Sequence, residues 1–215
     1  MALSKVNFNS INATPTASKF VTFNSDADGL AAGDVSGGLN LITTNTITSG
    51  VSSSSFTSSI DSTYDTYIFK LINIHCETNA VDFRFNGSID SGSNYNVTKT
   101  TTFFNATHQE DGGGGALSYQ AGNDLAQSTA AAQFAVALGN DADQSLSATV
   151  YLFSPASTTF VKHFMITSNS CHSSDKSQNH FIAGYFNTTS AIDAIQFIPE
   201  SDDIDSGVIK MYGVS

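Results

Sequence analysis

Residues 67–74 read YIFKLINI and residues 81–85 read VDFRF, and these two stretches decide the fold class. In the second stretch the apolar residues Val81, Phe83 and Phe85 alternate with polar ones. Alternation with a period of two sends successive side chains to opposite faces of a strand. The first stretch is a dense apolar run of strand length. Together they predict a β-sheet that buries one face.

Further strand-like stretches follow, each bounded by Gly, Pro, Asn, Asp or Ser, which are turn residues. Short strands separated by turns indicate a sandwich or barrel, and no amphipathic helix or fixed-period repeat is visible. We expect residues 60–215 to form an all-β domain, an antiparallel β-sandwich. The other predicted strands span residues 95–104, 124–138 (irregular), 145–153, 159–167, 180–186, 191–198 and 207–214. The predicted core contains Val81, Phe83, Phe85, Val150, Leu152, Phe164, Phe197 and Ile209.

Residues 1–59 differ from the rest, because short apolar pairs are separated by turn-rich stretches such as SGVSSSSFTSS (49–59). This pattern predicts an extended N-terminal arm without a core of its own, with extended pieces near residues 19–23 and 39–48. We expect the arm to attach to a neighbouring subunit or to a larger particle. The alternative is that it adds strands to its own sandwich. The apolar residues available for contact are Leu3, Val6, Phe8, Phe20, Val21, Phe23, Leu41 and Ile42.

Charge restricts the partners of the 215-residue chain, which carries a net charge of −11. This charge argues against binding to nucleic-acid phosphates and against an anionic membrane surface. No apolar run approaches the ~20 residues of a membrane span, and the opening MALSKVNFNS lacks the apolar region of a signal peptide. We therefore expect synthesis and assembly in a cytoplasm. Cys76 and Cys171 are expected as reduced thiols there, with a disulfide between them as the alternative.

Several longer phrases resemble a family of virion-surface proteins of marine tailed bacteriophages. They include YIFKLINIHCETNAVDFRF (67–85), GSNYNVTKTTTFFNATH (92–108), DLAQSTA (124–130), LFSPASTTFVKHF (152–164), AGYFNTTSAIDAIQF (183–197) and IDSGVIKMYGV (204–214). The resemblance implies a jelly-roll-like sandwich on the virion surface, in a tail-fibre or head-decoration protein, and supplies no catalytic motif. Our leading hypothesis is a structural or adhesive tail protein that contacts other virion proteins. The alternatives are a head decoration protein and a carbohydrate-binding module that contacts a host-surface glycan.

Three groups of residues suggest ligand sites, and each has a simpler interpretation. Asp26 and Asp28 precede Gly29 as in a fragment of a calcium loop, but an Asx turn explains them, as it does Asp141 with Asp143 and Asp202 with Asp203. Gly112–Gly115 lacks the Lys-Ser/Thr of a phosphate-binding loop and is expected to be an exposed, flexible loop. A zinc site would need four ligands, with unfamiliar spacing, from His75, Cys76, Cys171, His172 and His180.

No GxSxG, HExxH or CxxC motif is present, so we expect no enzyme activity, cofactor or metal. His163 lies among apolar residues of a predicted strand and is expected to be structural. If a sugar binds, the candidates are Tyr95 with Asn94 and Tyr119 with Asn123. The strand edges of a low-charge β-protein need covering, so we expect a homo-oligomer, with a trimer preferred.

Overall fold

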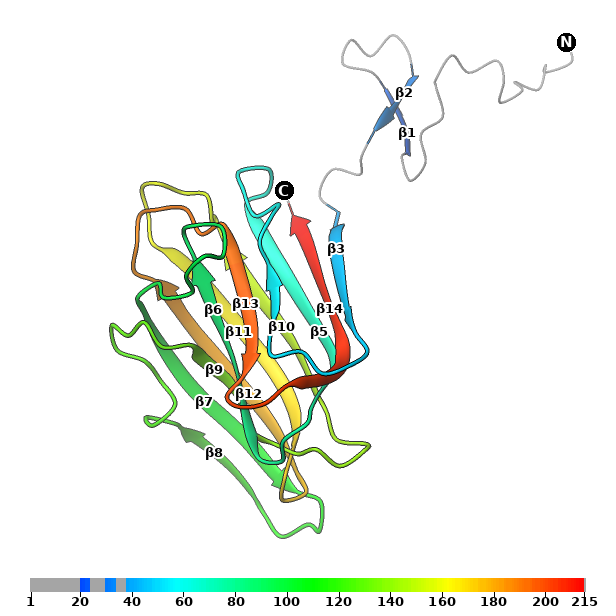
Figure 1. The fold of residues 1–215 in the computed structure, drawn as a ribbon, viewed down its shortest axis with the longest axis vertical. Coiled ribbons are helices and arrows are strands. Elements are labelled where there is room, and N and C mark those ends of the chain that lie inside the picture. Colours follow the sequence, from blue (N-terminus) through cyan, green and yellow to red (C-terminus); the bar gives the residue numbers. More distant parts are fainter. Residues whose placement is uncertain (1–19, 24–29, 34–37, 215) are drawn as a thin grey trace, which may run out of the picture. The chain divides into compact units, whose positions relative to one another are not determined.

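The computed structural model of the chain describes residues 20–23, 30–33 and 38–214. The chain divides into two units, Met1–Gly38 and Leu39–Ser215. In the first unit, β1 (Phe20–Phe23) and β2 (Leu30–Gly33) pair in an antiparallel manner. All remaining strands belong to the second unit (Figure 1).

The strands of the second unit share one hydrogen-bonded network that falls into two layers. The long sheet has the order β3-β14-β5-β10-β11-β12-β7-β8, and the short sheet has the order β4-β13-β6-β9. The bounds are β3 (Asn40–Ile47), β4 (Ser54–Phe56), β5 (Thr66–Cys76), β6 (Val81–Ser88), β7 (Lys99–Gln109), β8 (Gly115–Tyr119), β9 (Ala132–Leu138), β10 (Leu146–Phe153), β11 (Lys162–His172), β12 (Lys176–Phe186), β13 (Ala194–Pro199) and β14 (Ile204–Val214).

The strand pairing is nested in the manner of a jelly roll. β3 pairs with β14, β4 with β13, β5 with β10, and β6 with β9, all antiparallel. Successive nested pairs fall alternately into the long and the short sheet, as when one long hairpin folds over itself. The expected all-β, jelly-roll-like sandwich is therefore confirmed.

Two additions extend the long sheet beyond the nested pairs. The β11–β12 hairpin follows β10, and the β7–β8 hairpin joins it through the β7–β12 pairing. β11 also meets β9 of the short sheet through the pair His172–Leu138. This contact links the two sheets along one side of the sandwich.

The predicted core residues are all buried, each at most 2% exposed. An aromatic cluster joins the two sheets, because Phe85 of β6 contacts Phe164 of β11 and Phe186 of β12 edge-on or nearly so. Edge-to-face contacts of this kind add to the stabilisation from burial. The alternation that starts at Val81 thus identifies the inner face correctly.

The division between the two units lies earlier than the boundary expected at residue 59. β3 and β4 belong to the sandwich, where they pair with β14 and β13. Ile47 and Phe56 are buried in the core, and Ile42 packs against it. The apolar residues of this stretch are too sparse for an independent core. They suffice for β3 and β4 to join the sandwich, because the carboxy-terminal strands provide most of the buried surface.

Other boundaries shift by a few residues, and three strands, β2, β4 and β8, were not predicted. β7 begins at Lys99 and not at Tyr95, and the irregular strand expected at residues 124–138 is restricted to β9. β8 begins at the last glycine of the predicted loop Gly112–Gly115 and continues into residues for which no element was predicted. Its sequence GALSY is too short and too weakly patterned to predict a strand.

Replacing Gly184 by Ala is expected to lower the free energy of unfolding by about 1–3 kcal/mol. A Cβ atom at this position would lie 2.5 Å from the Thr100 carbonyl oxygen and 2.8 Å from Cζ of Phe164. Gly122→Ala is the matched control, because a Cβ there meets nothing within 4 Å. Urea unfolding of both variants measures the difference. Equal stability of the two would contradict the close approach at Gly184.

Candidate functional site

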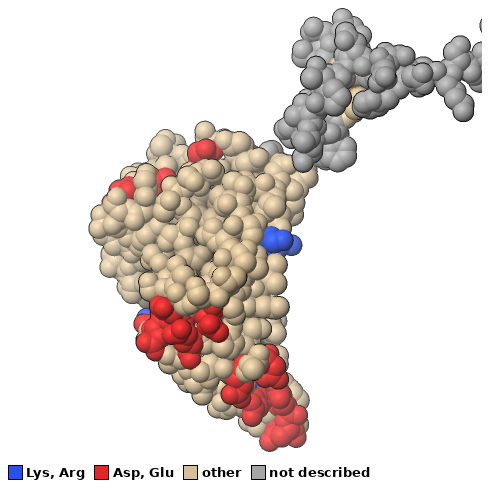
Figure 2. All heavy atoms as spheres, turned by 45° about the vertical axis from the view of Figure 1, so that its right-hand side comes forward, with Lys and Arg blue, Asp and Glu red and all other residues tan. Residues whose placement is uncertain are grey.

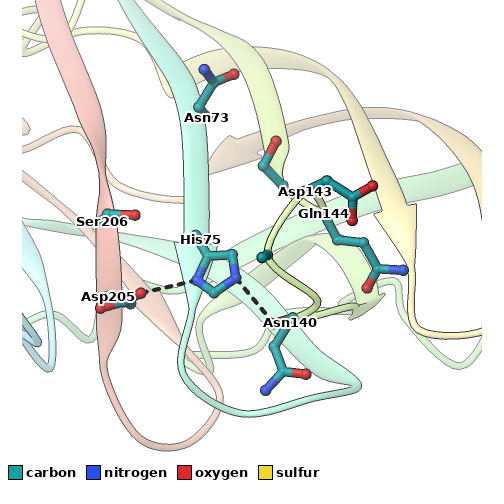
Figure 3. Close-up of a pocket in the computed structure, with 9 residues that line it drawn as sticks. Asn73, His75, Asn140, Asp143, Gln144, Asp205 and Ser206 are labelled. Carbon is teal, nitrogen blue, oxygen red and sulfur yellow. Dashed lines mark hydrogen bonds and ion pairs between the residues drawn. The ribbon is translucent and has the colours of Figure 1, made fainter.

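A polar hollow of about 620 Å³ lies on the outer side of the long sheet (Figure 3). It is formed by the ends of β5 and β14 and by the turn between β9 and β10. Its lining combines carboxylates, amides, hydroxyls and one imidazole. The residues are Asn73, His75, Asn140, Ala142, Asp143, Gln144, Ser145, Asp205 and Ser206.

Irregular backbone geometry creates this hollow. The register of β5 shifts against β10 between Leu146 and Ala148, and against β14 on both sides of Ser206. Asn73 has a φ of 49° and Gly207 a φ of 138°, both in the left-handed region. Bulges re-aim side chains and are frequent beside functional sites. Here they turn the strand ends away from the regular ladder and leave a polar depression.

His75 lies at the centre of the hollow, between two acceptors (Figure 3). Its Nδ1 is 3.2 Å from the Asp205 carboxylate, and its Nε2 is 3.2 Å from the Asn140 carbonyl oxygen. Both contacts are hydrogen bonds only when both ring nitrogens carry protons. The ring of His75 on β5 thus contacts both β14 and the β9–β10 turn.

The chemistry available in the hollow is hydrogen bonding. Both ring nitrogens of His75 lie 3.2 Å from an oxygen atom, one of Asp205 and one of Asn140. Within the described part of the chain, no group of three or more His, Cys, Asp or Glu side chains is placed to hold a metal ion. The hollow offers carboxylate and amide groups suited to a polar ligand with several hydroxyls.

The outer face of the long sheet mixes exposed apolar side chains with Ser, Thr and Asn, and it carries few charges besides the exposed Lys70. Met165 of β11 is 56% exposed, and Tyr151 of β10 and Phe104 of β7 are also exposed. Asp205 is the one carboxylate within the described strands of this sheet. A shallow hollow of about 440 Å³, lined mostly by apolar atoms, lies between β10, β11, β12 and β7 on this face.

The acidic residues gather in turns instead (Figure 2). The turns at the end of the sandwich where β5, β7, β9, β11 and β13 finish carry nine carboxylates in the sequence. They are Glu77, Glu110, Asp111, Asp141, Asp143, Asp175, Glu200, Asp202 and Asp203. This end carries much of the net negative charge, so repulsion disfavours contact between the acidic ends of two copies.

The five residues considered for zinc do not converge. His75 faces the polar hollow, whereas the neighbouring Cys76 points into the core, and burial raises the pKa of its thiol to about 12. Nδ1 of His172 accepts a hydrogen bond from the Ser174 backbone N–H, at 2.9 Å. His180 is fully buried, and Cys76 and Cys171 are free thiols.

The other ligand candidates lie apart from one another. Asp26 and Asp28 are outside the described residues. Asp141 and Asp143 lie in the β9–β10 turn, where Asp143 lines the polar hollow. Asp202, in the β13–β14 turn, accepts a hydrogen bond from the hydroxyl of Thr78. Gly112–Gly114 lie exposed in the β7–β8 turn, and Gly115 is the exposed first residue of β8.

The side chains considered for sugar binding mostly contact protein groups. The Asn94 amide donates to Asp90, at 2.7 Å, and the Asn123 amide donates to Gln133, at 2.9 Å. Tyr119 donates its hydroxyl proton to Asp124. Tyr95 packs over Gly92, where a Cβ would lie 2.7 Å from the tyrosine oxygen. His163 is exposed on the outer face, beside the ring of Tyr185.

The buried His180 makes stability sensitive to pH. Its Nδ1 lies 3.2 Å from Oγ of Ser168, which donates its own proton to the Phe134 carbonyl oxygen. His180 therefore donates from Nδ1. Burial lowers its pKa from 6.5 to about 4, and the nearby His172 adds to the effect.

Acidification from pH 7 to pH 4 is expected to cost about 3 kcal/mol of stability through His180 alone. The unfolded chain binds more protons than the folded chain between the two pKa values, so this stability is complete above pH 6.5 and is lost toward pH 4. Urea unfolding at both pH values, with His180→Gln as the control, isolates the contribution. A pH dependence that is the same in the variant would contradict it.

The sequence did not single out the polar hollow, because its residues come from distant segments and meet through strand register. Of its lining residues, the sequence indicated His75 and Asp143 as candidate ligands, but not Asn73 or Asp205. None of the described residues forms a helix of the length and apolarity that a membrane span requires. Comparison of the chain with protein-family models, with curated proteins and with solved structures gave no match.

Proposed function

We propose that this chain is a non-enzymatic structural protein of a tailed-phage virion, associated with the tail or its fibres, that works as a homo-oligomer. The observation that carries the proposal is the outer face of the long sheet. It exposes large apolar side chains and has Asp205 as its one described carboxylate. Exposed apolar surface of this kind is typical of protein contact sites. The jelly-roll pairing and the virion-protein resemblance of the sequence support the same conclusion.

A structural role fits the distribution of charge. The acidic turns favour solubility of the chain, while the sheet face, which carries few charges, remains free for contacts with other subunits. We propose that the chain is assembled in the host cytoplasm and functions at the virion surface.

The first unit, Met1–Gly38, is proposed as the attachment segment. Its strand β1 exposes the side chains of Val21 and Phe23, which would lose contact with water on another protein surface. Leu3, Val6 and Phe8, which were expected to contribute, lie outside the described residues. Apolar side chains on so short a hairpin gain stability mainly by docking, because two strands alone bury little surface.

Copy number in purified particles tests the proposed location. Quantitative mass spectrometry of virions should find this chain at the low copy number of tail proteins, relative to the major capsid protein. A copy number close to that of the capsid protein would support a head decoration protein instead. Failure to detect the chain in purified particles would exclude both locations.

A second candidate function is carbohydrate binding, which the polar hollow favours. Carboxylate and amide groups at Asp143 and Asn73 offer the planar acceptors and donors that adjacent sugar hydroxyls use. Binding of the full chain to a glycan array, and its loss in Asn73→Ala, would support this function. An array without binding would leave the structural function as the one supported by the chain.

A further inference from the structure

We propose that β8 (Gly115–Tyr119) joins two copies of this chain as antiparallel strands, around a two-fold axis at Leu117. The inference rests on the proposal that the chain self-associates, and it names the contact. Figure 1 shows β8 at the outer edge of the long sheet, beyond β7. Of the strands that the structure describes, only β7 pairs with β8.

The backbone of β8 has one side free. At one end of the β7–β8 ladder the Gln109 N–H donates to the Gly114 oxygen, at 3.1 Å. At the other end the Gln120 N–H donates to the Phe103 oxygen, at 2.8 Å. Hydrogen bonding alternates along an antiparallel strand. Ala116 and Ser118 therefore face β7, and the alternate residues Gly115, Leu117 and Tyr119 direct their N–H and C=O groups outward.

This edge lacks the features that normally protect a sheet edge. The sequence GALSY contains no charged residue and no proline, its register with β7 is regular, and all five residues are exposed. Natural proteins usually protect such edges with charges, proline, bulges or a covering segment. An unprotected edge is suited to pairing with another strand.

The edge is complementary to a second copy of itself. When Leu117 pairs with Leu117 of the second copy, Gly115 pairs with Tyr119, and every outward N–H and C=O finds a partner. Shifting the register by two residues leaves some of these groups unpaired. The two-fold arrangement is thus the one that satisfies the whole edge, and it is isologous, as is usual in dimers.

The exposed side chains and the charges favour the same arrangement. Leu117 is 74% exposed and Tyr119 is 54% exposed, and Tyr119 pairs with the exposed Phe104 on the outer face. Pairing of the edges would join these side chains into one apolar strip across the axis. Glu110 and Asp111 lie in the β7–β8 turn, and the antiparallel arrangement places the turns of the two copies at opposite ends. A chain with a net charge of −11 meets little repulsion at this uncharged edge.

Sedimentation of the full chain tests the contact. The wild-type chain should reach the mass of a dimer as its concentration rises. Leu117→Pro removes an outward N–H without breaking the pairing with β7, and Leu117→Lys places like charges at the axis. Both variants should stay monomeric, and their melting curves should show that they remain folded.

Cysteine trapping tests the register. A hydrogen-bonded antiparallel pair has Cα atoms about 5.5 Å apart, which allows a disulfide. In a Cys171→Ser background, Leu117→Cys should form covalent dimers with oxidised glutathione, whereas Phe160→Cys, at a position 71% exposed, should not. A monomer at all concentrations, a trimer, or a dimer that Leu117→Lys leaves intact would overturn the β8 contact. Labelling of virus particles does not depend on these results, so the proposed function is tested separately.

Discussion

A chain that begins at Ile60 is expected to lose cooperative folding, whereas a chain that begins at Leu39 is expected to keep it. The first deletion removes β3 and β4, which cover the edges of β14 and β13. It also removes the buried side chains of Ile47 and Phe56. Burial of each contributes roughly 1.5–3 kcal/mol, and total stabilities are about 5–15 kcal/mol.

The second deletion removes only the Met1–Gly38 unit, so the paired strands of the sandwich remain complete. Thermal unfolding followed by near-ultraviolet circular dichroism distinguishes the two chains, because tertiary packing of the aromatic residues gives the signal. If the chain that begins at Ile60 melts cooperatively at the wild-type temperature, then β3 and β4 are dispensable and the boundary at residue 59 holds after all.

Replacing Phe85 by Ala is expected to lower the free energy of unfolding by about 3–5 kcal/mol. The ring is fully buried between the sheets and contacts Phe134, Phe164 and Phe186, with ring centroids 6.2, 4.9 and 5.9 Å away. The cavity left by Ala would adjoin three large rings, which are too constrained to fill it completely.

Phe160→Ala is the matched control for this substitution. Phe160 lies in the β10–β11 loop and is 71% exposed, so the same chemical change should cost less than about 1 kcal/mol. Urea unfolding at neutral pH measures both variants. Similar losses in the two would mean that Phe85 is not at the junction of the sheets.

The inner face of the sandwich could be predicted from the sequence because each strand carries its own signal. The alternation around Phe83 and the apolar run around Phe69 identify buried faces without knowledge of their neighbours. β3, β4 and β8 carry weak signals of their own. They are strands because of what they pair with, and pairing between distant segments is not visible in one sequence.

The polar hollow was beyond prediction for a related reason. Its centre depends on a bulge on either side of β5 and on the left-handed conformation of Asn73. Nothing local in the sequence around Asn73 requires that conformation. His75 and Asp205 are far apart in the chain and meet because the shifted register of β14 brings them together.

Antibody labelling of intact particles tests the proposed function most directly. Purified virions of the tailed phage that we propose as the source of this chain would be incubated with an antibody raised against residues 39–215 and viewed by electron microscopy. We predict label at the tail or its fibres, with the head unlabelled. Particles that remain unlabelled, although the antibody detects the chain in the infected cell, would contradict a role at the virion surface.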